Sequence, residues 1–254
     1  MTAIVACTTA PVTDRRQLAL VPVSSLAAQS DELYAQLKDE TGIVRGTRNA
    51  RMVQRIGERV AEAAESYMRE NGMEDQIELY DWEFALFDDD EQINAFCMPG
   101  GKIGIYTGIL PVTDGEAGLA TIMGHEVAHA IANHSQERMS QMLVLELGAN
   151  TLEAALDEQP EQTRNLLLAA YGVGAQVGVL LPYNREQEYE ADVIGLVLMA
   201  KAGYDPRNAV DLWQRMNDLG GQRPPEFLST HPHPEERIDR IRENIPTAME
   251  YYRN

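Results

Sequence analysis

Two histidines and one glutamate have the spacing of a metal site with an adjacent base. His125, Glu126 and His129 form the pattern H-E-x-x-H within an apolar stretch of helical periodicity. At about 100° per residue, the two histidines lie roughly 40° apart on one helical face, so both imidazoles can bind one zinc ion. Glu126 follows the first histidine and can reach a water molecule on that ion. The pattern therefore predicts zinc-dependent hydrolysis, with Glu126 as the general base.

A third ligand is needed to make this pattern specific. The extended form H-E-x-x-H-x-x-G-x-x-H is absent, because Ala132 and Ser135 occupy its glycine and third histidine positions. His134 lies one residue short, and on a continuous helix it would point about 140° away from His129. We therefore expect His134 to be a surface or packing histidine.

A later acidic stretch, residues 184–195, offers another third ligand. Glu188, Asp192 and Gly195 share one helical face at i, i+4 and i+7, whereas Glu190 points about 160° away from Glu188. On the shared face, Glu188 can bind the metal and Asp192 can accept a hydrogen bond from the outer nitrogen of a ligating histidine. Gly195 would let the two helices approach closely. Taken alone, the stretch also fits a solvated acidic helix face, but the H-E-x-x-H pattern favours a metal site.

The first elements along the chain are expected to be helices. Residues 30–42 open with acidic residues and end at a glycine, as helices commonly do. Residues 47–71 repeat apolar side chains at three- and four-residue steps, and Gly72 can end that helix. Thr113 and Glu116 have the spacing of a capping box at the start of the H-E-x-x-H helix.

A small sheet should precede that helix, and more helices should follow it. Residues 77–84 alternate in polarity, and residues 93–96 and 102–107 form two further short strands, joined by a tight turn. The later helices are predicted at residues 136–156, 161–181, 184–202 and 207–219, with a last one from about residue 235. The expected fold is α+β and mostly helical, with a small, mostly antiparallel sheet before the H-E-x-x-H helix.

The ends of the predicted domain follow from a change in composition. Residues 29–250 are expected to form one domain. Residues 1–28 are interpreted as a signal remnant, a lipid-attachment site and a tether, because Cys7 follows a short apolar run as in bacterial lipoprotein signals. An ordinary flexible N-terminus is the alternative. Cys97 is expected to be a small buried hydrophobe, and two cysteines make no disulfide framework.

Charge and hydropathy limit the kinds of partner. The net charge is −19, with 40 acidic against 21 basic residues, which argues against nucleic acid or an anionic membrane surface as the main partner. No uninterrupted run reaches the roughly 18–20 apolar residues of a membrane span. Leu166 to Leu181 comes nearest, and its glycines favour a buried helix packed tightly against another element. Insertion of this segment into a membrane is the alternative.

Four stretches of the sequence carry a family resemblance. They are Asn94-Ala-Phe, Pro99-Gly-Gly101, Gly124-His-Glu-Val-Ala-His129, and Glu188-Tyr-Glu-Ala-Asp192 with Gly195 three residues on. Together they resemble metallopeptidase family forty-eight, the HtpX-type and CAAX-prenyl-protease-like zinc peptidases, over about residues 28–245. The resemblance implies a zincin fold of the gluzincin type and makes Glu188 the third zinc ligand. Asn184 stands where the family usually has serine, a departure that touches no proposed ligand.

The resemblance also implies further site residues. Asn94, Ala95 and Phe96 would bind an extended substrate along an exposed strand beside the cleft. His231, in a Thr-His-Pro stretch, is similar to a family histidine near the metal, where it could donate to the oxyanion or occupy the open position. Arg237 is expected to anchor this loop electrostatically.

The expected function is that of an endopeptidase with one Zn²⁺, held by His125, His129 and Glu188. A zinc-bound water would attack the peptide bond of unfolded or extended polypeptides, in protein quality control. The best match is to soluble bacterial lipoprotein members without a C-terminal repeat domain, so we expect a periplasmic protein, anchored to the outer membrane through a lipid on Cys7. The alternative is a non-cleaving zinc-containing chaperone or binding module whose metal is capped by His231.

Overall fold

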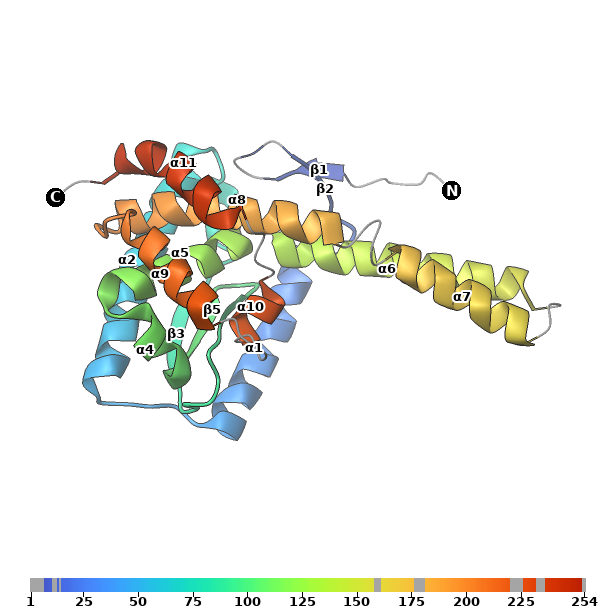
Figure 1. Cartoon of the computed structure of the whole chain (residues 1–254), viewed down its shortest axis with the longest axis horizontal. Helices are drawn as coiled ribbons and strands as arrows, with labels where there is room; N and C mark the ends of the chain where they lie inside the picture. Colours follow the sequence, from blue (N-terminus) through green and yellow to red (C-terminus); the bar gives the residue numbers. More distant parts are fainter. Residues whose placement is uncertain are drawn as a thin grey trace.

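A three-stranded sheet with helices packed on both faces forms the body of the molecule (Figure 1). The computed structural model describes residues 7–10, 13, 15–157, 161–175, 181–219, 226–231 and 236–252. The strands are β1 (Cys7–Thr9), β2 (Arg16–Leu18), β3 (Glu83–Phe87), β4 (Ala95–Met98) and β5 (Lys102–Tyr106). The α+β, mostly helical class predicted from the sequence is confirmed.

Helices make up most of the described chain. The first group is α1 (Val23–Thr41), α2 (Arg48–Glu70), α3 (Glu74–Ile77), a 3₁₀ turn at Thr107–Ile109, α4 (Leu110–Thr113) and α5 (Glu116–Ile131). The second group is α6 (His134–Ala155), α7 (Glu161–Ala175), α8 (Leu181–Lys201), α9 (Asn208–Leu219), α10 (Glu226–Thr230) and α11 (Arg237–Met249). The H-E-x-x-H pattern therefore lies on α5 and the acidic stretch on α8.

The sheet has the strand order β3-β5-β4, which leaves β4 at one edge. β4 and β5 pair antiparallel, with Cys97 opposite Ile103, whereas β3 pairs with β5 in parallel. The sheet is therefore mixed: β4 and β5 form a hairpin, and β3 lies on the far side of β5.

The alternation at residues 77–84 does not form a strand over its whole length. α3 ends at Ile77, and β3 begins only at Glu83. Tyr80 and Trp82 are the alternating partly buried residues between them, and their rings stack with centroids 4.7 Å apart. Both rings pack against the core from a loop that forms no strand, so the predicted strand starts too early.

α2 forms as its sequence pattern predicts. The apolar residues Val53, Ile56 and Val60 are buried in the main core, on the face that packs against the sheet and α5. Thr47 begins the helix, because its hydroxyl accepts the backbone N–H of Ala50 at 3.1 Å. Gly72 follows the helix with φ of 69°, a left-handed conformation in which glycine is favoured.

The opposite face of the sheet is covered by α1. Tyr34 of α1 is buried, and its ring packs edge-on against Phe87 and Phe96. Its hydroxyl donates to the carbonyl of Ile103 in the central strand at 2.7 Å. This contact ties the residues before α2 into the body of the domain.

The N-terminal residues differ from a simple tether. β1 and β2 pair antiparallel, Gln17 is buried, and α1 begins at Val23 rather than near Ser30. The side chain of Cys7 lies outside the described residues, so attachment of a lipid there stays a prediction.

The predicted capping box at α5 is wrong. Gly115 is the N-cap residue of α5, and no side chain caps it. The Thr113 hydroxyl instead donates to the carbonyl of Leu110 within α4, and Glu116 pairs with Arg55 of α2 at 2.5 Å. The short helix α4, which ends at Thr113, uses the hydroxyl that the sequence pattern assigned to α5.

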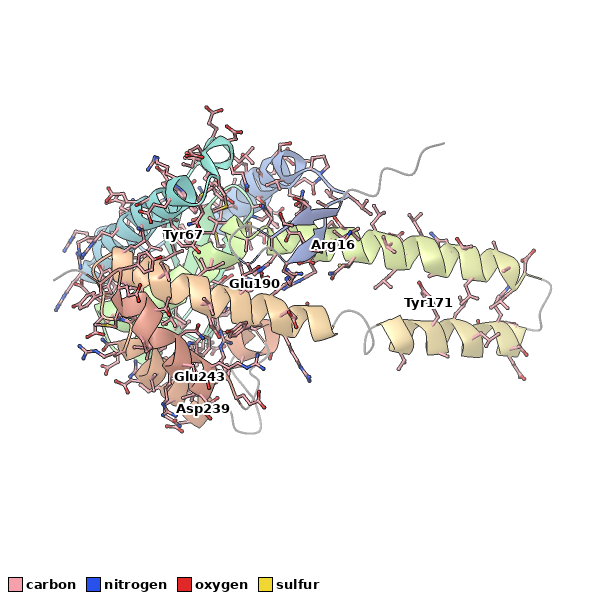
Figure 2. The ribbon with its side chains drawn as sticks, turned by 90° about the horizontal axis from the view of Figure 1, so that it is seen from above. Arg16, Tyr67, Tyr171, Glu190, Asp239 and Glu243 are labelled. Carbon is pink, nitrogen blue, oxygen red and sulfur yellow. The ribbon has the colours of Figure 1, made fainter. Side chains whose placement is uncertain are left out.

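α6 and α7 form a helical hairpin that extends away from the sheet (Figure 1), and Figure 2 shows the same arrangement from above. The predicted buried helix over Leu166 to Leu181 is therefore wrong for its described part. Leu167 and Val173 of α7 are exposed, because α7 packs along α6 and not against the core. Within the described residues, no helix combines the length and hydropathy that crossing a membrane requires.

α5 and α8 approach each other at the level of their backbones. A methyl group added to Gly124 would lie 2.8 Å from the carbonyl oxygen of Gly195. A methyl group added to Gly195 would lie 2.9 Å from the backbone nitrogen of His125. The predicted close approach at Gly195 is thus present, and it occurs beside the first histidine of the H-E-x-x-H pattern.

We expect Gly195→Ala to lower the free energy of unfolding by about 1–3 kcal/mol, because the methyl group overlaps backbone that has no room to shift. Gly172→Ala is the matched control, since Gly172 is exposed in α7 with nothing near its added methyl. Helix propensity should make the control neutral or stabilising by up to about 1 kcal/mol. Chemical denaturation measures both, and equal effects would contradict the close approach.

Candidate metal centre

Four side chains converge where α5 and α8 cross. His125 and His129 of α5, Glu188 of α8 and His231, which follows α10, each place one ligand atom within 4.8 Å of all the others. The Nε2 atoms of the two α5 histidines are 3.1 Å apart, and each lies 3.3 Å from a Glu188 oxygen. Ligands about 2.0–2.1 Å from a tetrahedral zinc ion are about 3.3 Å from one another. The donor set and its spacing therefore fit a zinc ion.

His231 completes this cluster from a different part of the chain. Its Nδ1 lies 3.1 Å from Glu188 Oε1 and 3.2 Å from His125 Nε2. Its backbone N–H donates to the carbonyl of Phe227 at 2.9 Å, and its ring stacks on the ring of that residue. The one-turn helix α10 thus holds His231 over the other three ligands.

Asp192 and Arg237 lie behind the ligands. Asp192 Oδ1 is 3.0 Å from His125 Nδ1, so a proton on Nδ1 leaves Nε2 free to bind a metal. Arg237 donates to Asp192 at 2.6 Å and to Glu188 at 3.4 Å, and its guanidinium lies 3.5 Å from the ring centroid of Trp213. The expected role of Arg237 as a loop anchor stays a prediction, and its guanidinium directly contacts the carboxylate of Glu188.

The chain turns sharply before His134 and brings it back to the site. Asn133 separates α5 from α6 and has φ of 58°, a left-handed conformation that asparagine tolerates better than most residues. His134 is consequently buried, with its Nδ1 2.8 Å from His129 Nδ1. His134 is thus a packing histidine outside the ligand cluster, as one of the two expected alternatives had it, but the predicted direction away from His129 is wrong because it assumed one continuous helix.

Glu190 is a second residue that the sequence reasoning left out of the site. It faces away from Glu188 as predicted, but it is buried and lies 3.1 Å from His134 Nε2. The signal in the sequence for the contact between His134 and Glu190 is Asn133, because asparagine permits a turn at the residue before His134.

The charge states of His129 and Glu188 suit metal binding, whereas His125 must lose a proton to bind a metal. Burial opposes a charge on His125, but hydrogen bonds to Asp192 and Glu188 outweigh it and raise its pKa to about 9. Burial lowers the pKa of His129 well below its ordinary value. Burial would raise the pKa of Glu188, yet the neighbouring His129 and His125 hold it well below its usual range. Neutral His129 and ionised Glu188 are the forms that bind a metal.

Glu126 lies buried on α5 beside β4. Burial raises the pKa of its carboxyl, although His231 and His125 nearby act in the opposite direction. Its Oε1 is 3.3 Å from His231 Nε2 without hydrogen-bond geometry. The backbone N–H of Cys97 donates to the carboxylate. A buried carboxyl with a raised pKa, next to a group of candidate metal ligands, is suited to receive and return a proton.

β4 presents its free edge to this part of α5. The carbonyl of Asn94 accepts the backbone N–H of Tyr106 in β5 at 3.2 Å. The backbone polar groups of every second residue from Asn94 therefore point toward β5. The N–H of Cys97 instead faces Glu126. Because backbone direction alternates along a strand, the groups on the free edge belong to Ala95 and Cys97.

The three predicted substrate-binding residues lie at this edge only in part. Asn94 precedes the strand, and its side chain accepts the N–H of Ala95 at 2.9 Å. Phe96 turns its ring into the cluster under α1, with its centroid 5.6 Å from that of Phe87. Cys97, which was expected to be a buried hydrophobe, is partly buried at the edge itself.

Residues 47–245 match the model of Peptidase family M48. The chain belongs to this family. The resemblance expected from the four sequence stretches is thereby confirmed, and the fold and the clustered ligands are those of a metallopeptidase.

Three relatives show the range of this M48 similarity. The chain is 39% identical over 170 residues to mitochondrial metalloendopeptidase OMA1 of Schizosaccharomyces pombe, which covers 66% of the chain and 48% of the relative. It is 36% identical over 163 residues to the mitochondrial metalloendopeptidase OMA1 of Homo sapiens (62% and 31%). It is 32% identical over 168 residues to the beta-barrel assembly-enhancing protease of Yersinia pestis (63% and 33%). The match thus spans about half of these relatives or less.

The predicted location is wrong. A bacterial periplasmic protein anchored to the outer membrane was expected, yet mitochondrial M48 enzymes of two yeasts and of Arabidopsis thaliana match at 39%, 34% and 37% identity. Bacterial proteases match as well. Because relatives from both settings match this chain at similar identity, membership of the family carries no information about the compartment.

The thiol of Cys97 provides a test of how β4 packs against α5. Burial, with a contribution from the negative charge of Glu126, raises the pKa of this thiol well above its ordinary value. The thiolate is the reactive form, so at pH 7.5 we expect folded Cys7→Ser protein to react with a thiol reagent at least about tenfold more slowly than the denatured chain. The rate should keep rising with pH after labelling of the denatured chain has levelled off, because the pKa of the buried thiol is the higher of the two. Rapid labelling of the folded protein at pH 7.5 would contradict this packing.

Proposed function

We propose that the chain is a zinc-dependent endopeptidase that hydrolyses extended or unfolded polypeptides. The observation that carries the proposal is the convergence of ligand atoms from His125, His129, Glu188 and His231 within 4.8 Å. Glu126, a buried carboxyl with a raised pKa, lies beside them. Membership of Peptidase family M48 and the metalloendopeptidase names of the relatives support the same activity.

The proposed chemistry divides between the metal and the protein. His125, His129 and Glu188 would hold Zn²⁺, which supplies a Lewis acid that polarises the scissile carbonyl and acidifies water. Glu126 takes the proton from the attacking water and gives it to the leaving amine. His231 lies where its imidazole can donate to the oxyanion as negative charge develops. Asp192 and Arg237 keep the imidazole of His125 and the carboxylate of Glu188 in place.

Substrate is proposed to bind along the free edge of β4, beside residues 94–96. An extended peptide that pairs with Ala95 and Cys97 would lie against the strand whose backbone touches Glu126, and it would take the place of the contacts that their N–H groups make with Asn94 and Glu126. Backbone pairing reads an extended shape rather than a particular sequence. This mode favours unfolded chains as substrates and fits a role in protein quality control.

Glu126→Gln tests the peptidase mechanism. The amide has nearly the same size but cannot take up a proton, so cleavage of unfolded casein should fall by about 10²–10⁴-fold. Bound zinc, measured by elemental analysis, should stay at one ion per chain, because Glu126 is not a ligand. Cleavage that persists in this variant would disprove the proposed role of the base.

An alternative function is supported by the position of His231. Its Nδ1 is as close to Glu188 and His125 as these ligands are to each other, so it can serve as a fourth zinc ligand and cap the site. The chain would then be a zinc-containing binding module that holds unfolded polypeptides without cutting them.

His231→Ala separates the two functions. If His231 assists catalysis, the variant should cut casein at least about tenfold more slowly than the wild type, because an oxyanion donor is lost. If His231 caps a latent enzyme, the variant should cut faster. A wild type that binds zinc and unfolded casein but cuts nothing, with or without this substitution, would support the binding module. Casein binding by light scattering supplies the second measurement.

A further inference from the structure

A line of polar contacts runs from one metal ligand to the N-terminal segment. His129 Nδ1 lies 2.8 Å from His134 Nδ1, and His134 Nε2 lies 3.1 Å from Glu190 Oε2. Arg15, just before β2, donates from Nε to the same Glu190 oxygen at 2.9 Å. Thr13 also donates its hydroxyl to Glu190. The ligand is therefore linked through two buried side chains to a residue more than a hundred positions earlier.

The chemistry of the groups fixes the direction of each hydrogen bond. An ionised carboxylate only accepts, so His134 must carry its proton on Nε2 and donate it to Glu190. Nδ1 of neutral His134 then has a lone pair and accepts a hydrogen bond from the N–H at Nδ1 of His129. Nε2 of His129 is left unprotonated, on the side that faces Glu188. His134 and Glu190 thus select the one tautomer of His129 that can bind a metal.

Arg15 joins this line to a second buried carboxylate. Its two terminal nitrogens donate to Glu137 of α6 at 2.7 and 2.6 Å, while Nε donates to Glu190. Glu137 is 1% exposed and Glu190 3% exposed. Two carboxylates buried this deeply repel each other and are costly to keep charged without a cation between them. Arg15 supplies that cation, and its planar fork holds both groups in fixed positions.

The N-terminal segment, residues 15–21, also makes neutral polar contacts with α6. The backbone N–H of Leu20 donates to the Ser140 hydroxyl at 2.9 Å, and Gln136 donates to the carbonyl of Val21 at 2.7 Å. Gln17 is buried there with neither side-chain polar atom hydrogen-bonded. Hydrogen bonds between charged groups are the stronger kind, so the charge pairs of Arg15 are the strongest of these polar contacts. Figure 2 shows the strand pair, with Arg16 labelled, beside the part of α8 that bears Glu190.

We propose that His134 and Glu190 are positioning residues for the ligand His129, and that Arg15 fixes them from the N-terminal segment. The inference rests on the metal site of the proposed function, but it needs no peptidase activity. Its consequence is that zinc is retained fully only while the N-terminal segment is docked on α6. An effector or cleavage event that releases this segment would therefore weaken metal binding without touching a ligand.

The test measures zinc affinity and zinc release rate in the full chain, by competition with a chromophoric chelator. Glu190→Gln and His134→Phe should each weaken zinc binding about 10–100-fold, the usual effect of removing an outer partner of a ligand. Arg15→Ala should weaken it about tenfold, and Arg15→Lys should restore part of the loss. Arg16→Ala is the matched control, because Arg16 is an exposed arginine one residue along and should leave zinc affinity unchanged.

The visible spectrum of the Co²⁺-substituted protein and the Tm of the metal-free protein complete the test. The Co²⁺ bands should shift in Glu190→Gln, since the orientation of His129 changes. If Arg15→Ala and Glu190→Gln lower the Tm but leave zinc affinity and the Co²⁺ bands unchanged, their role is only structural and the proposal is wrong. It is also wrong if Arg16→Ala weakens zinc as much as Arg15→Ala does. Should Glu190→Gln not fold, the Arg15 and Arg16 variants decide the question.

These results separate the proposal from the proposed function. A protein that cuts no polypeptide, but loses zinc in the Arg15 and Glu190 variants, would refute the peptidase activity and support the positioning role. A protein that cuts casein, yet retains zinc equally in all these variants, would support the peptidase activity and refute the positioning role.

Discussion

The close approach of α5 and α8 is the constraint on which the site depends. Two ligands lie on α5 and one on α8, and the backbones of the helices meet at Gly124 and Gly195. No side chain separates the helices at that point, so the distance between the histidine pair and Glu188 is set by main-chain contact. Main-chain positions vary less than long side chains do, which suits a cluster that must fit one ion.

Around this contact, each ligand is held by a partner on its far side. Asp192 holds His125, and His134 with Glu190 holds His129. The partners are themselves buried, so their polar atoms need further partners, and the network extends outward until it reaches Arg237 on one side and Arg15 on the other. Burying carboxylates without cations is unfavourable. The network therefore ends at arginines, which balance the negative charge of its buried carboxylates.

The sequence was informative wherever one helix carries the whole pattern. The spacing of His125 and His129, and the shared face of Glu188, Asp192 and Gly195, need only the geometry of a regular helix. His134 was misplaced because its position depends on a turn at Asn133, where the chain leaves that regular geometry. Local periodicity describes a helix well and a junction between helices poorly.

Patterns that have two structural explanations were also misread. The alternating polarity at residues 77–84 lies mostly in a loop with two stacked rings, and only its last two residues belong to a strand. The apolar run from residue 166 predicted a buried helix, although periodicity does not say which element covers it. Arg15 could not be identified at all, since its importance arises from Glu137 and Glu190, which are distant in sequence and adjacent only in the fold.

The helical hairpin has a consequence for how this domain can vary. α6 and α7 lie in the chain between the last ligand of α5 and Glu188 of α8, so the two halves of the site are joined by a long excursion. The ends of that excursion are fixed by the contact between α5 and α8, and closure entropy grows by only about 0.6 kcal/mol for each doubling of length. Segments of very different size and character can therefore be exchanged in the outer part of the hairpin, beyond the residues of α6 that contact the N-terminal segment, while the ligands stay in register. The hairpin is therefore the place where the same peptidase core can carry a different inserted segment.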